Sequence, residues 1–476
     1  MRQETDSTGG QSTLTAASPL ASVSHTWRAL RHRNFKLFFF GQSISVIGTW
    51  MTRLATAWLV YQLTHSALLL GVVSFAGQIV SFLLGPFAGV WVERMERRRL
   101  LVITQAAGAV QSLALAGLTL AHVITLGEII GLMAFQGLIN AFDMPGRQSF
   151  LIQMVEDRGD LANAIAINSS MANGARLIGP AIAGIIIAGF GEGWCFLIDG
   201  VSYFAVIASL LLMRIPALKG RDGAESSLLV ELREGWDYVR GFRPIRTILL
   251  LFALTCLMGW PYSVLLPVFA AKVLHGGAHT LGWLTAASGV GAFSSALALA
   301  MRKSVVGLTR TLQAAAVLLG AGLILFGLSH ILWLSLALMV VVGFGLIQAA
   351  AVSNTIIQSL VPDDKRARVM GYYTMAFFGA APFGSLMAGA LAQHIGAPET
   401  VMLTGAFCIA GAAWFTLQLP KIRPEMRATY REKELSARAA ADEARTAARQ
   451  ASASIPTPKM SSATPHQRLM SMPRER

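Results

Sequence analysis

Apolar stretches of about 20 residues recur along this sequence, and no other feature limits its fold as strongly. Each stretch is long enough to cross a lipid bilayer as one helix, in which the backbone polar groups bond to one another. The composition agrees, because 54% of the residues are hydrophobic and 13% are charged, whereas a soluble chain carries roughly twice that charged fraction. We therefore predict an all-α integral membrane protein, since the sequence lacks the short alternating segments of a β-barrel.

Twelve stretches are expected to form transmembrane helices, six before and six after a charged connection. They lie near residues 36–62, 68–92, 99–121, 125–146, 164–190, 194–213, 246–271, 279–301, 309–328, 331–357, 370–393 and 398–419. The predicted organisation is a disordered N-terminal tail (1–34), a first six-helix bundle (35–213), a linker with an amphipathic surface helix (214–245), a second six-helix bundle (246–419) and a basic tail (420–476), helical and then disordered.

Lysine and arginine are distributed very unevenly over the loops between these spans. One set of alternate loops holds nearly all of them, whereas the other set holds only Lys272. An excess of Lys and Arg marks the cytoplasmic side, so we expect a multi-pass protein of the bacterial cytoplasmic (inner) membrane with both termini in the cytoplasm. The same distribution explains the net charge of +14 without a nucleic acid partner. The remaining loops carry scattered histidines without metal-ligand spacing, and no nucleotide-binding motif occurs, so we expect no metal and no cofactor.

The two sets of six spans share weak internal similarity. Gly71 and Gly282 lie 211 residues apart, and Gly137 and Gly343 lie 206 apart. Two further pairs, 205 residues apart, follow in the same order: Gly179 with Gly384, and Gly184 with Gly389. This order indicates a duplicated six-helix unit with pseudo-symmetric halves, a construction that many secondary transporters use, with the substrate path between the halves.

A charged segment, GPFAGVWVERMERRRLLV, separates the second span from the third. It resembles the signature of the major facilitator superfamily at this place, which runs Gly, three residues, Asp-Arg, one residue, Gly and two basic residues. Two positions differ, since glutamate replaces the aspartate and also the second glycine. The acidic residue at that glycine is similar to the branch of the bacterial enterobactin exporter and macrolide efflux proteins. The matching positions are Gly89, Glu93, Arg94, Glu96, Arg97 and Arg98.

Five other stretches resemble that branch, and together they cover about a quarter of the chain. They are FFFGQSISVIGTWM, INAFDMPGRQSF, NAIAINSSMANGARLIGPAIAG, FLIDGVSYFA and VPDDKRARVMGYYTMAFFGAAPFGSLMAG. The resemblance implies the major facilitator fold, and it implies no particular substrate.

The resemblance also implies a cytoplasmic gate between the two halves. Glu93 would lie at the start of the eleventh span near Gly371, where an anion beside a helix N-terminus is favoured. Arg97 would pair with Asp143 at the cytoplasmic end of the fourth span, and Arg147 shares a helix face with Asp143. Such a cluster would break and reform as the protein alternates between two open states. The alternative is that these charges only anchor the topology.

Three further ionisable residues lie inside predicted spans, where charges are costly and are therefore functional candidates. Arg53, flanked by Trp50, could receive an anionic or polar substrate group, or it could reach the outer interface or make a fixed helix-to-helix bond. Asp199 is the candidate for proton binding, with a structural hydrogen bond as the alternative. Arg176 precedes a Gly-Pro pair that resembles a degenerate antiporter signature. Many proton-coupled exporters carry a basic residue where this chain has Met133, so coupling through that position is in doubt.

Glycines around the Gly-Pro pair and their counterparts in the second half are expected to allow close helix packing, with a proline kink. These residues are Gly174, Gly179, Pro180, Gly184, Gly384 and Gly389.

These features favour a secondary active transporter that exports a small amphipathic molecule, driven by protons, through alternating access. The resemblance implies siderophores, macrolides or drug-like compounds as substrates, and a monomer embedded in the bilayer. One alternative is a lipid or lysophospholipid translocator, with a cavity open to the membrane. Another is a non-transporting membrane sensor that signals through its tails. We do not expect an enzyme, since no nucleophile and base or pair of carboxylates shares one depth in the membrane.

Overall fold

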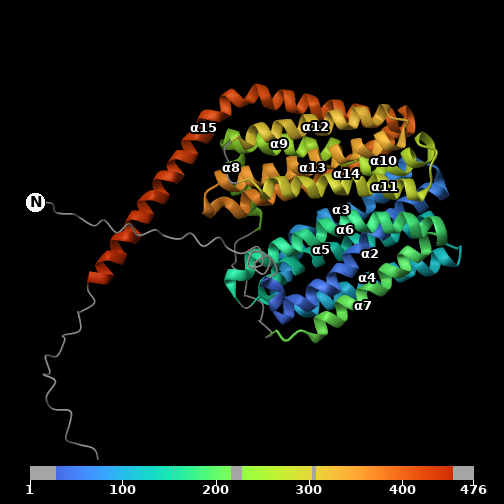
Figure 1. Cartoon of the computed structure of the whole chain (residues 1–476), viewed down its shortest axis with the longest axis horizontal. Helices are drawn as coiled ribbons and strands as arrows, with labels where there is room; N and C mark the ends of the chain where they lie inside the picture. Colours follow the sequence, from blue (N-terminus) through green and yellow to red (C-terminus); the bar gives the residue numbers. More distant parts are fainter. Residues whose placement is uncertain (1–27, 156, 216–227, 303–306, 454–476) are drawn as a thin grey trace, which may run out of the picture. The chain divides into compact units, whose positions relative to one another are not determined.

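The computed structural model describes residues 28–155, 157–215, 228–302 and 307–453. The predicted N-terminal tail, part of the linker and the end of the C-terminal tail lie outside these residues. By contact clustering the chain forms two compact units, Met1–Pro420 and Lys421–Arg476. In the first unit long helices run side by side (Figure 1).

The elements of the first half begin with a 3-10 turn, η1, and continue to α7. Their bounds are η1 Arg28–Arg31, α2 Arg33–Thr64, α3 Ala67–Arg94, α4 Arg97–Leu120, α5 Leu126–Leu151, η2 Ile152–Met154, η3 Arg158–Asp160, α6 Leu161–Phe190 and α7 Glu192–Leu212.

The second half begins with the linker helix α8 and ends with α15, which continues into the second unit. The bounds are α8 Leu228–Gly241, α9 Arg243–Gly259, α10 Tyr262–Val268, the π-helical turn η4 Phe269–Val273, α11 Ala278–Ala300, α12 Leu308–Leu328, α13 Leu332–Leu360, α14 Asp363–Ile395 and α15 Ala397–Ala453.

The helices follow the twelve predicted spans closely, so the all-α membrane fold is confirmed. Within the described residues, ten segments are long and apolar enough to cross a membrane. The two predicted spans outside that set are α2 and α5, which are helices of 32 and 26 residues. Both carry charged side chains away from their ends, Arg53 in α2 and Asp143 in α5. The other two candidate charges, Arg176 and Asp199, lie in α6 and α7, which are among the ten segments.

The seventh span is broken near its middle by proline. α9 ends at Gly259, Pro261 precedes α10, and Pro267 lies inside that short helix. Proline lacks the N–H that would continue the hydrogen-bond ladder and its ring clashes with the preceding turn. The break leaves Trp260 between α9 and α10, which matters for the site below.

Two pairs of helices join the halves, α3 with α14 and α6 with α11. A Cβ on Gly71 would lie 2.7 Å from the carbonyl oxygen of Ser385, and one on Gly389 would lie 3.0 Å from Cα of Gly71. A Cβ on Gly184 would likewise lie 3.2 Å from Cα of Gly282. The backbones approach this closely because these residues have no side chains. Since all four glycines are near the helix ends joined at residues 65–66, 191, 274–277 and 396, we call this the glycine end and the other the basic end.

Helices α3 and α14, which meet at the glycine end, separate towards the basic end. Phe75 of α3 and Phe383 of α14 still touch, with ring centroids 5.8 Å apart. Farther on, a Cβ built on Gly85 of α3 or on Gly371 of α14 would meet no described atom within 4 Å. The described contacts between the halves are therefore closest at the glycine end.

Glycine packing inside each half repeats with the sequence offsets. Gly137 of α5 faces the backbone of Gly77 in α3, and Gly343 of α13 faces that of Ser288 in α11. Residues 77 and 288 are 211 apart, the offset that also relates Gly71 to Gly282. The sequence similarity thus corresponds to equivalent contacts in space.

The segment before each half packs on the fifth helix of that half. In the first half, Arg28 and His32 lie 3.1 Å from Asp160, the residue before α6. In the second half, Glu234 of α8 lies 2.7 Å from Arg368 of α14, and the rings of Trp236 and Tyr372 are 5.9 Å apart. The linker helix α8 thus contacts α14 through Trp236, although the side chain of Trp236 is still exposed.

Candidate functional site

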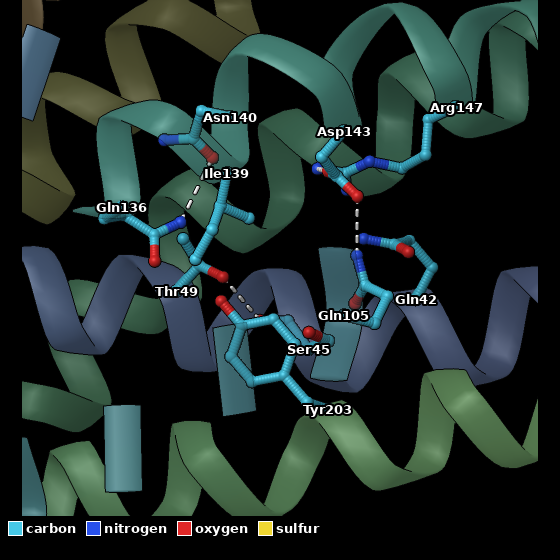
Figure 2. A pocket seen from close by; sticks show the side chains of 10 residues that line it. All are labelled: Gln42, Ser45, Thr49, Gln105, Gln136, Ile139, Asn140, Asp143, Arg147 and Tyr203. Carbon is cyan, nitrogen blue, oxygen red and sulfur yellow. Dashed lines mark hydrogen bonds and ion pairs between the residues drawn. The ribbon is translucent and has the colours of Figure 1, made fainter. Parts of the chain in front are cut away.

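A polar pocket lies inside the first half, between α2, α4, α5 and α7 (Figure 2). The space it encloses measures about 310 Å³, counting the part open to solvent. The sequence places polar side chains along one face of α2 at intervals of three and four residues, so that they share one side of the helix. The lining residues are Gln42, Ser45, Thr49, Gln105, Gln136, Ile139, Asn140, Asp143, Arg147 and Tyr203.

Asp143 is the buried carboxylate of this pocket. It pairs with Arg147 one turn later on α5, and it accepts hydrogen bonds from Thr104 at 3.0 Å and Gln105 at 2.7 Å, both on α4. The side chain of Asp143 is 3% exposed and that of Arg147 is 32% exposed. Because burial of a lone carboxylate is costly, this set of partners is what allows the charge to stay inside the bundle.

The partner of Asp143 differs from the one expected. Arg97 was predicted to pair with it, whereas the described ion pair is with Arg147. Arg97 is the first residue of α4, and Thr104 lies seven residues deeper, roughly 10 Å along the helix axis. Asp143 lies beside Thr104, about two turns further along α4 than Arg97.

The rest of the charged signature lies where α3 ends and α4 begins. For Gly89, Glu93 and Arg94 only the helical backbone is described, so the expected contact of Glu93 lies outside the described residues. Arg98 donates a hydrogen bond of 2.7 Å to the carbonyl oxygen of Leu211 at the end of α7. The segment thus connects α3, α4 and α7 at the basic end.

Asp199 of α7 is a second buried carboxylate, 1% exposed. Its Oδ2 accepts hydrogen bonds of 2.8 Å from Thr52 of α2 and from Ser112 of α4. Its Oδ1 has no hydrogen-bond partner among the described residues, and a Cβ on Gly48 would lie 2.7 Å from that atom. Asp199 therefore has hydroxyl donors on one oxygen, whereas the other oxygen is packed against Gly48 without a donor among the described residues.

Tyr203 lies one turn after Asp199 on α7 and lines the pocket of Asp143. Its ring packs where Gly108 of α4 has no side chain, since a Cβ there would be 2.7 Å from the ring. Asp199 is thus one helical turn away, along α7, from a residue of the pocket that holds Asp143.

The two membrane arginines meet at Trp50 of α2. The guanidinium carbon of Arg53 lies 4.9 Å from the Trp50 ring centroid, and that of Arg176 lies 5.6 Å from it. Arg176 also lies 5.4 Å from the ring centroid of Trp260, in the second half. These distances are in the range of cation–π attraction. Arg176 is therefore held between tryptophans of both halves.

The expected packing residues differ in their surroundings. Gly179 packs on α2, with a Cβ there 2.6 Å from Cβ of Trp50, and Pro180 lies inside α6. A Cβ on Gly384 would lie 2.9 Å from Cγ of Pro261. Gly184 and Gly389 form the contacts between the halves described above. Gly174 does not follow the expectation, because a Cβ there would meet no described atom within 4 Å.

Sequence reasoning missed several residues of this region. Tyr203 and Trp260 were not singled out, although Trp260 follows Trp50 by 210 residues, close to the other repeat offsets. The amide side chains of the pocket were also missed, although amides inside apolar spans indicate a functional site much as charges do. The missed pocket residues are Gln42, Gln105, Gln136 and Asn140.

Comparisons with known proteins agree on one class. The family described as "Transmembrane secretion effector" matches residues 24–446. The staphyloferrin A transporter of Staphylococcus aureus is 27% identical, over 82% of this chain and 98% of its own length. The multidrug efflux pump Tap of Mycolicibacterium fortuitum is 27% identical (77% and 91%), and macrolide efflux protein A of Streptococcus pyogenes is 22% identical (80% and 96%).

Solved structures of similar fold are distant in sequence. A POT family transporter in complex with 5-aminolevulinic acid has a TM-score of 0.66 at 13% identity, covering 82% of this chain and 96% of that one. The nucleoside transporter NupG gives 0.63 at 14% identity (82% and 99%). A bacterial homologue of the lysosomal transporter Spinster, in an inward-facing and unoccupied conformation, gives 0.61 at 13% (88% and 99%).

Proposed function

Because this chain belongs to the transmembrane secretion effector family, a branch of the major facilitator superfamily of membrane transporters, we propose that it is a proton-driven exporter of small amphipathic molecules. The observation that carries this proposal is the presence of two buried carboxylates inside the first half, Asp143 in the polar pocket and Asp199 one helical turn before Tyr203, which lines that pocket. Relatives named for staphyloferrin A, drugs and macrolides support export of compounds of that size.

We place the basic end of the bundle in the cytoplasm. The loops at that end carry nearly all of the arginine and lysine, as cytoplasmic loops do. Both termini then lie in the cytoplasm, and the protein lies in the bacterial cytoplasmic membrane.

With this orientation we infer an inward-facing conformation. The halves meet through glycines at the outer end, and contact between α3 and α14 continues as far as Phe82 and Gly379, whereas a Cβ on Gly85 or Gly371 would meet no described atom within 4 Å. On this proposal the substrate path is closed to the outside and open to the cytoplasm. Alternating access requires the reverse state as well, and the charged segment between α3 and α4, from Gly89 to Arg98, would close the cytoplasmic side in that state.

Asp199 is the proposed proton-binding group. Its carboxylate is buried, one of its oxygens lacks a hydrogen-bond donor, and Arg53 of the neighbouring helix is among its charged neighbours. Loss or gain of a proton there would change the attraction to Arg53, which lies at Trp50 near the meeting of the halves. Asp143, Arg147 and Tyr203 would connect this group to the cytoplasmic side.

The test is efflux from cells that lack their main pumps and are loaded with siderophores, macrolides or lipophilic dyes. We expect efflux that a protonophore abolishes and that Asp199→Asn lowers strongly. Thr404→Val, at the equivalent position of the second half, is the matched control, because its hydroxyl bonds to the backbone of its own helix and carries no charge.

Two outcomes would redirect the proposal. Efflux that persists with the protonophore and in the Asp199→Asn variant would mean that another gradient drives transport. No efflux of any compound, with the protein shown to be in the membrane, would favour the lipid translocator, which a lipid-flip assay in vesicles would then examine.

A further inference from the structure

Resting on the proposed export function, we propose that the substrates of this chain are organic anions with a planar apolar body. The anionic group would bind Arg53 and Arg176 of the first half, and the apolar body would pack on the aromatic face of the second half beside Trp260. The two arginines and two tryptophans meet where the halves face each other.

Both arginines lie deep in the membrane. Arg176 is near the middle of α6, about 22 Å from one helix end and about 21 Å from the other. Arg53 is about 16 Å from the nearer end of α2. These spans are too long for an arginine side chain to reach the membrane surface. A charge at that depth costs several kcal/mol unless it has a partner or faces water, so its presence needs an explanation.

Neither guanidinium has a fixed anionic partner. Within the described chain, no carboxylate lies within 4.0 Å of Arg53 or Arg176, and neither donates a hydrogen bond. Arg53 is exposed and Arg176 is half-buried, so their N–H groups are accessible. The tryptophans interact with the faces of the guanidinium groups and leave the N–H edges free to bind a carboxylate or similar anion in pairs.

The balance of charge favours an anion whatever the protonation state of the nearby acid. Arg53 interacts with Arg176 and with Asp199, the one carboxylate among its charged neighbours in the described chain. The region therefore carries one excess positive charge when Asp199 is ionised, and two when it is not. A lipophilic cation would be repelled, in a medium where charges interact more strongly than in water.

The second half supplies an aromatic surface. Trp260 packs edge-to-face on Phe377 at 5.4 Å, and Phe377 lies parallel to Phe252 at 6.1 Å. Phe252 stacks on Tyr373 at 4.4 Å. Phe252 is buried and supports the half-buried rings of Trp260 and Phe377, which can bind a planar, apolar group by offset stacking and edge contacts. With the arginines opposite, the site recognises a molecule with one charged and one flat apolar part.

The experiment compares two probes with the same ring and opposite charge. 1-Naphthoate and 1-naphthylmethylammonium are titrated by calorimetry into the purified full-length protein in lipid nanodiscs. We expect naphthoate to bind at least 10-fold more tightly. Arg176→Gln and Arg53→Gln should each weaken naphthoate binding at least 5-fold, whereas Arg310→Gln, an exposed arginine of α12, should leave it unchanged. Trp260→Leu should weaken it, and Trp260→Phe should retain it.

The proposal would be overturned if the two probes bound equally well, if the ammonium probe bound more tightly, or if neither bound at millimolar concentration. It would also be overturned if the glutamine variants bound naphthoate normally. Arg176→Lys keeps the charge, and a symmetric gel-filtration peak of each variant excludes misfolding. Transport in proteoliposomes separates the two proposals. Naphthoate binding without transport of any compound would contradict the exporter alone, and export of cations that both arginine variants leave unchanged would contradict anion recognition alone.

Discussion

The two halves of this protein share one scaffold and differ in what they bury. The repeat offsets of 205 and 206 residues place Ala349 where the first half has Asp143, and Thr404 where it has Asp199. They also place Ala381 where the first half has Arg176. All three counterparts are buried. The second half folds into the same helices without a charge at these positions, so the fold itself does not require the charges of the first half.

This difference between the halves distinguishes residues that stabilise the fold from residues that belong to the functional site. Both halves contribute to the glycine contacts, since Gly71 of the first half meets Gly389 of the second and Gly184 of the first meets Gly282 of the second. Buried ion pairs seldom stabilise a fold more than apolar residues of the same volume would. Replacing these charges as complete pairs is therefore expected to affect transport more than stability, whereas removing one partner of a pair also lowers stability. The paired glycines are expected to affect stability.

The largest effect is expected from Asp199 and its counterpart. Asp199→Asn keeps the size of the side chain and removes its ability to bind a proton, so proton-driven export should fall roughly 10- to 100-fold, the range of a coupling between two sites. Thr404→Val should change it less than twofold. Efflux rates at equal expression measure both, and an equal loss in the two variants would contradict a functional difference between the halves.

Breaking the Asp143–Arg147 pair should give the next effect, on stability. Arg147→Gln leaves Asp143 buried without its cation, at a cost of about 2 kcal/mol once the partial exposure of Arg147 is considered. Melting in detergent should show a loss of about 2 °C. Adding Asp143→Asn should restore most of it, whereas Ser353→Ala, at the counterpart of Arg147, should change little. Additive losses in the double variant would show that the two residues are not coupled.

The paired glycines should give equal effects in both halves. Gly184→Ala and Gly389→Ala each place a methyl group within about 3 Å of the opposite backbone, which should cost about 1–2 kcal/mol. Gly174→Ala, where no described atom is near, should be neutral or slightly stabilising, because alanine favours a helix. Melting temperatures measure all three. A clear difference between Gly184→Ala and Gly389→Ala would mean that the halves do not meet symmetrically.

The smallest effects on stability are expected at the ion pairs between the fifth helix region of each half and the segment that precedes that half. Asp160→Asn removes a carboxylate that is 15% exposed and contacts Arg28 and His32, at about 1 kcal/mol. Glu234→Gln removes one that is 51% exposed and contacts Arg368, and the loss should be smaller. Melting at low and high salt distinguishes them, since only the more exposed pair should be largely screened. The opposite order would mean that α8 is more important for stability than η1.

The apolar pattern predicted the helices well because a membrane span needs a fixed length and few charges, and both are visible in the sequence. The break at Pro261 followed from the missing N–H of proline. The duplicated glycines predicted which positions correspond, but not which helices meet, since one glycine looks the same against a neighbour in its own half or in the other. Gly174 shows the limit, because it lies in the same helix only five residues before Gly179, yet a Cβ there would meet no described atom within 4 Å.

The site was only partly predictable. Arg53, Arg176, Asp143 and Asp199 were visible as charges inside apolar spans, yet their partners depend on the rotation and depth of each helix. One sequence does not give these, which is why Arg97 was expected where Arg147 is found. Tyr203 was missed because a tyrosine in an apolar span looks like a packing residue until its neighbours are known.

The place of Arg176 along α6 gives that helix unequal lever arms. Gly184, at the glycine contact, is eight residues from Arg176, about 12 Å, whereas Leu161 at the basic end is fifteen residues away, about 22 Å. If α6 turns as a rigid rod about the level of Arg176, a rotation of roughly 20° that parts Gly184 from Gly282 by about 4 Å carries Leu161 about 8 Å in the opposite direction. A small separation between two glycines at the glycine end thus becomes a displacement twice as large at the basic end.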